Sequence, residues 1–66
     1  MNKSGLKKAI NIAGSQAELA ALLKGASQQN ISYWLRSGKV PAERVLAIEE
    51  VTGVTRHELR PDLYPA

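Results

Sequence analysis

Apolar residues recur at helical spacing in several short stretches of this chain. In residues 4–13 they fall at i, i+3, i+4 and i+7, at Leu6, Ala9, Ile10 and Ala13. That spacing places them on one face of a helix, which Gly14 ends. The first element predicted is therefore an amphipathic helix with one face in a core.

A second helix is predicted over about 15–24. Ser15 and Glu18 have the spacing of a capping box, in which each side chain bonds the backbone N–H of the other residue. Lys24 and Gly25 are expected to end it, because a cation is stabilised at a helix C-terminus and glycine adopts left-handed turn conformations. Its buried face is expected to consist of Leu19, Ala20, Leu22 and Leu23.

A third helix, over about 27–37, has two contrasting faces. Ser27 can cap its N-terminus, and Gly38 follows its last residue. The apolar positions, expected in the core, are Ile31, Trp34 and Leu35. The opposite face is polar and rich in amides, with Gln28, Gln29, Ser32, Tyr33 and Arg36.

The rest of the chain continues the helical pattern. Pro41 lies near the first turn of a fourth helix, which Gly53 ends, and Thr55 with Glu58 forms a second capping-box spacing before a short final turn. The proline-containing tail is expected to be extended or turn-like. The sequence thus predicts one all-α domain over residues 1–66, a compact bundle of about five short helices.

Size and composition exclude several classes of protein. A chain of 66 residues with 44% hydrophobic residues forms a thin core and no deep catalytic cleft, and we find no nucleophile–base pair. With no cysteine, one histidine and six carboxylates, we expect no metal site and no cofactor. The apolar run at 19–23 is too short to span a membrane, and no signal-peptide pattern is present. We therefore expect a cytoplasmic, non-enzymatic protein.

The net charge of +3 is unevenly distributed along the chain. Residues 1–40 contain six basic residues and one acidic residue, whereas residues 41–66 contain three basic and five acidic residues. A positive half that includes the amide-rich helix is typical of a domain that binds a polyanion. The acidic half offers a surface for a protein partner.

The second and third predicted helices have the features of a helix-turn-helix. Both are short, their link contains Gly25, and the small Ala20 allows the next helix to approach closely. In this motif the second helix presents its polar face to the DNA major groove, where amides pair with adenine and guanidinium groups with guanine. The sequence thus predicts double-stranded DNA as a partner.

The site predicted on this basis has three groups of residues. Base contacts are expected from Gln28, Gln29, Ser32 and Arg36. Phosphate contacts are expected from Gln16, Lys24, Ser27, Tyr33 and Lys39. Support from the core is expected from Ala20, Ile31, Trp34 and Leu35.

Several of these residues have a second interpretation. The two glutamines fit an ordinary solvated helix start, Trp34 could stack on a ligand although its stripe favours the core, and Tyr33 could cover the protein rim. Arg36 could cap the helix C-terminus. Leu63 and Tyr64 either fold back over the core or contribute to a homodimer contact.

The chain also resembles two groups of known regulators. Residues 16–20 (QAELA) and 25–35 (GASQQNISYWL) resemble the helix-turn-helix of the short Cro-like repressors of temperate phages. Residues 38–44 (GKVPAER), with Ile48-Glu49, and residues 55–63 (TRHELRPDL) are similar to the YdaS-type antitoxin and regulator family. The resemblance implies a lambda-repressor-like fold. It also implies a sequence-specific DNA-binding regulator of prophage or plasmid origin that acts at operators, often as a homodimer.

One spacing departs from the family pattern. Four residues separate Ala20 from Gly25, where the common pattern has three. Either the second helix is one residue longer, or the turn is looser and Lys24 bulges into it. The presentation of Gln28 depends on which of these holds.

These observations predict a Cro-like repressor that binds a pseudo-palindromic operator through the major groove as a weak homodimer. The alternative is an antitoxin or antirepressor that acts mainly through a protein partner, such as a toxin or another regulator.

Overall fold

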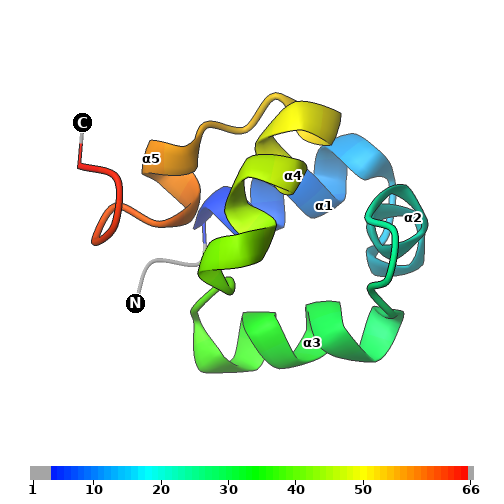
Figure 1. Ribbon diagram of the computed structural model, residues 1–66. Helices are drawn as coiled ribbons and strands as arrows, with labels where there is room; N and C mark the ends of the chain where they lie inside the picture. Colours follow the sequence, from blue (N-terminus) through cyan, green and yellow to red (C-terminus); the bar gives the residue numbers. More distant parts are fainter. Residues whose placement is uncertain (1–3, 66) are drawn as a thin grey trace.

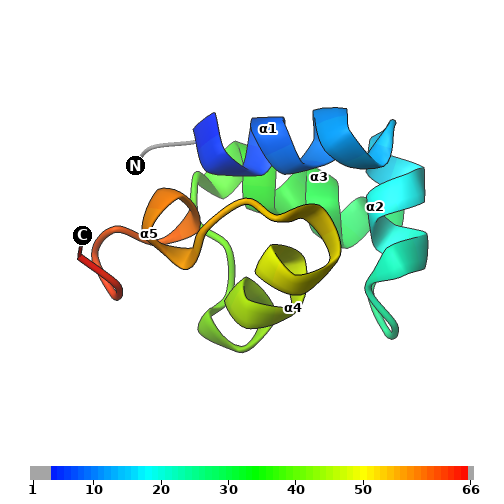
Figure 2. The ribbon, with the colours of Figure 1, turned by 90° about the horizontal axis from the view of Figure 1, so that it is seen from above.

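The computed structural model describes residues 4–65, and all of its regular elements are helices. They are α1 (Ser4–Ala13), α2 (Gln16–Leu22), α3 (Gln28–Ser37), α4 (Ala42–Thr52) and α5 (Arg56–Leu59). In Figure 1, α3 runs along the bottom of the molecule, α2 stands at one end, and α4 lies above α3. Figure 2 shows α1 on the side of the bundle opposite α4, with α5 near the two termini. The predicted all-α class is confirmed.

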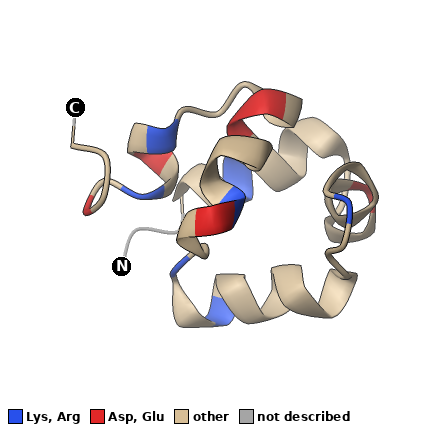
Figure 3. Cartoon of the chain, viewed as in Figure 1, with Lys and Arg blue, Asp and Glu red and all other residues tan. Residues whose placement is uncertain are grey.

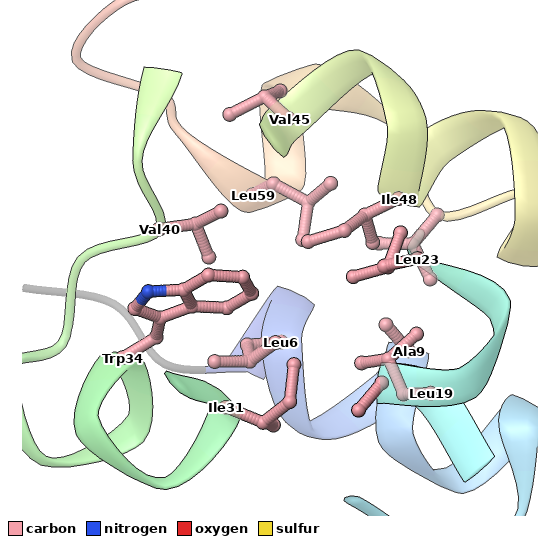
Figure 4. Close-up of a cluster of buried hydrophobic side chains, with 12 residues drawn as sticks. Leu6, Ala9, Leu19, Leu23, Ile31, Trp34, Val40, Val45, Ile48 and Leu59 are labelled. Atoms are coloured by element: carbon pink, nitrogen blue, oxygen red, sulfur yellow. The ribbon is translucent and has the colours of Figure 1, made fainter. Parts of the chain in front are cut away.

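The core is a cluster of apolar side chains to which every helix contributes. Its buried members are Leu6, Ala9, Leu19, Ala20, Leu23, Ile31, Trp34, Val40, Val45, Ile48, Val54 and Leu59. Figure 4 shows the indole of Trp34 pointing from α3 into this cluster, beside Val40. Leu35 is partly buried and packs against the same cluster. One face of α3 is therefore held by the core, and its opposite face is left exposed.

The end of α2 differs from the sequence prediction. The helix ends at Leu22, and Leu23 follows as its C-cap with an extended backbone, φ −96° and ψ 98°. The predicted end at Lys24 was thus two residues too late. The additional residue before Gly25, which has φ +86°, lies in the turn between α2 and α3 rather than in the helix. Of the two alternatives left by the spacing, the structure shows the looser turn.

Leu22 is a second correction, because this side chain lies outside the core. Leu23 is 2% exposed, whereas Leu22 is 48% exposed. A helix turns by about 100° per residue. Viewed down the axis from Leu19, Ala20 and Leu23 therefore lie to one side of Leu19, and Leu22 lies to its other side. The core lies on the side of Ala20 and Leu23, so Leu22 remains at the surface.

Each of the two predicted capping boxes, Ser15 with Glu18 and Thr55 with Glu58, forms only one of its two hydrogen bonds. The backbone N–H of Glu18 donates to the Ser15 hydroxyl at 3.1 Å, and that of Glu58 donates to Thr55 at 3.3 Å. The reciprocal bonds, in which the backbone N–H groups of Ser15 and Thr55 would donate to the Glu18 and Glu58 carboxylates, are not among the hydrogen bonds of residues 4–65. The Glu58 carboxylate instead pairs with Lys8 of α1 at 3.5 Å.

The tail after α5 folds back through a buried arginine. Arg60 is 7% exposed; it donates to the Val40 carbonyl at 2.6 Å and to both carboxylate oxygens of Asp62 at 2.9 and 2.6 Å. The hydrogen bonds from Arg60 lower the pKa of the Asp62 carboxyl to about 2. Tyr64 is partly buried against the core, whereas Leu63 is 44% exposed. The tail is thus turn-like, and it is tied to the link between α3 and α4.

The ion pair predicts a pH dependence of stability. Because the pKa of Asp62 falls from 3.8 to about 2 on folding, the stabilisation is fully present above the higher value and is lost as the pH falls through the lower one. We expect the difference in unfolding free energy between the parent chain and Asp62→Asn to shrink across this interval, in urea unfolding from neutral pH to about 2. Glu50→Gln, at an exposed position without an ion pair in residues 4–65, controls for loss of negative charge. A constant difference for Asp62→Asn would contradict this account.

The two neighbouring leucines of α2 give a matched test of the core. Leu23→Ala removes a fully buried side chain and is expected to lower the unfolding free energy by about 2–5 kcal/mol. Leu22→Ala removes a half-exposed side chain and is expected to cost about 1 kcal/mol or less. Chemical denaturation of both variants measures these costs. Equal losses would show that Leu22 shares the core.

Candidate nucleic-acid interface

The exposed face of α3 gathers the residues that the sequence predicts to read bases. Gln28, Ser32 and Arg36 are four residues apart and therefore line up along one side of the helix. Together with Gln29, Leu35 and Gln16 of α2, they line an open depression on the surface. The four predicted base contacts thus lie together, beside one of the predicted phosphate contacts.

A hydrogen bond connects the two helices at this depression. The Ser32 hydroxyl donates to Oε1 of Gln16 at 2.6 Å. This bond holds the start of α2 against the middle of α3 and orients the Gln16 amide beside the exposed face. The Gln16 amide group keeps two N–H donors that no residue in 4–65 accepts, and these can bond a phosphate oxygen.

A complete capping box defines the N-terminus of α3. The backbone N–H of Asn30 donates to the Ser27 hydroxyl at 3.2 Å, and the Ser27 N–H donates to the Asn30 side chain at 3.0 Å. The N–H groups of Gln28 and Gln29 in the first turn have no intrahelical acceptor, and they lie at the positive end of the helix dipole. Sequence analysis identified Ser27 but missed Asn30, although its spacing of three residues is the local signal for such a box.

The C-terminus of α3 is capped without Arg36. Gly38 adopts the left-handed conformation, with φ 75°, and its N–H donates to the Trp34 carbonyl at 2.9 Å. The Ser37 hydroxyl donates to the same carbonyl at 3.2 Å. The Arg36 side chain is exposed and makes no hydrogen bond with residues 4–65. Arg36 is therefore available to a ligand at the depression.

Of the other predicted phosphate contacts, Ser27 caps the N-terminus of α3, and the remaining three lie at two further places. Tyr33, 61% exposed, borders a second depression with Lys39, Pro41 and Arg60, on another side of α3. Lys24 is exposed in the turn between α2 and α3. The structure therefore divides the predicted phosphate contacts between both sides of α3 and the turn that precedes it.

The positive half of the sequence does not form one basic face. Arg36 is the charged residue of α3, and Figure 3 shows acidic segments on the ribbon of α4 above it. Lys8, on α1, is paired with Glu58 of α5. The face of α3 is therefore mainly an amide surface with one cation, and further positive charge reaches it from Lys24 and Lys39 at its two ends.

Sequence analysis also missed an arginine beside the turn before α3. Nη1 of Arg44 donates to the Lys24 carbonyl at 3.1 Å and Nη2 donates to the Gly25 carbonyl at 3.3 Å. These partners are 20 and 19 residues away in the chain, so no local spacing signals the contact.

Residues 4–65 contain no group of three or more histidine, aspartate or glutamate side chains placed to hold a metal ion. Within the same range, none of the helices has the length and hydropathy needed to cross a bilayer.

The chain is similar to a known prophage regulator over its whole length. It is 48% identical to the Cro protein from the putative prophage element Xfaso 1 in Xylella fastidiosa strain Ann-1, with a TM-score of 0.89 and coverage of 100% of both chains. This similarity confirms the predicted Cro-like, helix-turn-helix fold, in which α2 and α3 form the motif. No curated protein matches the chain. Residues 6–66 match the family model described as "Bacterial toxin YdaS", and the chain therefore belongs to the YdaS family.

Proposed function

We propose that this protein is a sequence-specific DNA-binding regulator that represses transcription by occupying a pseudo-palindromic operator and excluding polymerase. One observation carries the proposal. Gln28, Gln29, Ser32 and Arg36 converge on the exposed face of α3, the second helix of a helix-turn-helix, while the opposite face is fixed in the core. The similarity to a prophage Cro protein supports the same function.

The side chains at the depression have the chemistry of direct base readout. A glutamine amide can form two hydrogen bonds with adenine, and a guanidinium group can form two with guanine. Each such pair contributes about 1–3 kcal/mol of discrimination against a wrong base. We assign these roles to Gln28 or Gln29 and to Arg36, while Ser32 positions Gln16 and borders the same bases.

The groups around the depression fit phosphate contacts. The first-turn N–H groups of α3 and the Ser27 hydroxyl lie at a helix N-terminus, where anions are stabilised. Lys24 lies next to this end, and Tyr33 and Lys39 lie toward the other. In this proposal these residues set the register of α3 on the duplex without reading its sequence.

The dimensions of the molecule support a homodimer on DNA. Its longest extent is 28 Å, whereas successive major grooves on one side of B-DNA are about 34 Å apart. One copy therefore reaches one groove, and a second copy is needed to read a second half-site. We propose that Leu63, which the folded tail leaves 44% exposed, contributes to the contact between the copies, with the half-buried Tyr64 behind it.

A second candidate function is that of an antitoxin or antirepressor whose main ligand is a toxin or another regulator protein. The observation that favours it is a groove between α2 and α4 that exposes two apolar side chains, Leu22 and Val51, which are 48% and 39% exposed. Charged side chains, Lys24, Arg44 and Glu50, also line this groove. A DNA shift assay at several salt concentrations, combined with a pull-down, separates the two functions. The second candidate requires a stoichiometric protein partner and no salt-sensitive DNA binding.

Selection of bound sequences from a random DNA pool at stated salt tests the main proposal. We expect a pseudo-palindrome, and we expect Gln28→Ala or Arg36→Ala to cost about 1–3 kcal/mol at one base position. Lys39→Ala should weaken operator and random DNA alike and flatten the salt dependence. Asn11→Ala, at an exposed amide of α1, is the matched control and should change neither affinity. Equal losses on operator and random DNA for Gln28→Ala would exclude direct readout by that residue.

A second measurement concerns the contact between copies. We expect Leu63→Ser to lower the cooperativity of operator binding and to weaken self-association in sedimentation equilibrium, because it removes an exposed apolar contact. Ile12→Ser, at a 53% exposed position of α1, is the matched control and should alter neither. If both variants associate like the parent chain, the dimer contact lies elsewhere on the surface.

A further inference from the structure

The turn between α2 and α3 has few contacts of its own. It runs from Leu23 to Ser27 and includes the exposed Lys24. Within it, the Ala26 N–H donates to the Leu23 carbonyl at 3.0 Å, and Gly25 adopts φ +86°. Ala26 also packs against the core, whereas Lys24 and Gly25 are exposed. One internal hydrogen bond thus closes the turn, and the exposed carbonyls of Lys24 and Gly25 accept none from within it.

Arg44 of α4 bonds the turn carbonyls from outside the turn. Its two terminal nitrogens donate to the consecutive carbonyls of Lys24 and Gly25, at 3.1 and 3.3 Å. A planar guanidinium group is suited to this pattern, since its N–H donors have a fixed geometry. Helix α4, which carries Arg44, is firmly placed because the neighbouring Val45 is fully buried in the core.

The contact from Arg44 lies close in the chain to the exposed face of α3. Gly25 is two residues before Ser27, the N-cap of α3, and three before Gln28, the first of the predicted base contacts. The turn carbonyls are exposed, so water can replace the guanidinium group if Arg44 is removed. Removal of Arg44 would therefore leave no buried carbonyl unsatisfied, and we expect it to affect the conformation of the turn more than the stability of the fold.

We infer that Arg44 is a positioning residue, which holds the enlarged turn and thereby sets the place of the N-terminal end of α3 on DNA. The expected effect of Arg44 on DNA binding rests on the proposed function, whereas its expected effect on the turn does not. Small displacements of groups that read bases weaken their hydrogen bonds, which depend steeply on distance and angle. Arg44 thus affects specificity without touching a base.

The test compares three variants with the parent chain. Arg44→Gln removes the positive charge and the paired guanidinium donors. Arg44→Lys keeps the charge but replaces the paired donors by a single ammonium group. Arg56→Gln is the matched control, because Arg56 is also a partly exposed arginine but bonds Glu49 instead of the turn. Denaturation curves first establish that each variant folds.

The first measurement uses the free protein. In Arg44→Gln, we expect the Ala26 amide to exchange its hydrogen at least about fivefold faster, with unchanged protection in α1, since only the turn is loosened. Arg56→Gln should leave the Ala26 amide unchanged. Unchanged exchange in Arg44→Gln would overturn the inference whatever the DNA experiments show.

The second measurement uses the selected operator and random DNA. We expect Arg44→Gln to bind the operator about tenfold more weakly, the equivalent of part of one base contact, with a change of about twofold or less on random DNA. Arg44→Lys should recover part of the loss. Equal losses on both DNAs, a salt dependence lower by about one charge and full recovery by lysine would make Arg44 a phosphate contact instead. If the parent chain itself prefers no sequence, the proposed function fails, and amide exchange still decides the role of Arg44 in the turn.

Discussion

Burial of Ile31 and Trp34 fixes the rotation of α3, and the rest of the site depends on it. These side chains are 0% and 5% exposed, and they lie in the cluster that all five helices share. A helix advances by about 100° per residue, so fixing these two positions also decides which residues face outward. Gln28, Ser32 and Arg36 form the outer face for this reason, and the polar surface follows from the packing beneath it.

The two ends of α3 are defined as firmly as its rotation. Ser27 and Asn30 satisfy each other at the N-terminus, while Gly38 and Ser37 satisfy the Trp34 carbonyl at the C-terminus. Arg36 is consequently not needed as a cap. The resulting surface has amides that suit specificity but few charges that would add affinity, which agrees with the proposal that two copies bind one operator.

The C-terminal half supports this surface through arginines that bond main-chain carbonyls. Arg44 bonds the turn before α3, and Arg60 bonds Val40 in the link after it. Both arginines belong to the acidic half of the sequence. The charge balance of that half counts them as positive charges and gives no sign of their hydrogen bonds to main-chain carbonyls. In the folded protein they bond the segments on either side of α3.

The sequence by itself determined the helices, the core stripe of α3 and the residues on its outer face, because periodicity and capping act over three or four residues. The tertiary structure decided where α2 ends, that Leu22 stays outside the core, and that Arg44 and Arg60 bond carbonyls about 20 residues away. It also decided that the described basic residues of the first half are divided between α1, α3 and the links on either side of α3, and that Lys8 is paired with Glu58. Such contacts depend on how helices pack against one another, and no spacing within a single helix specifies them.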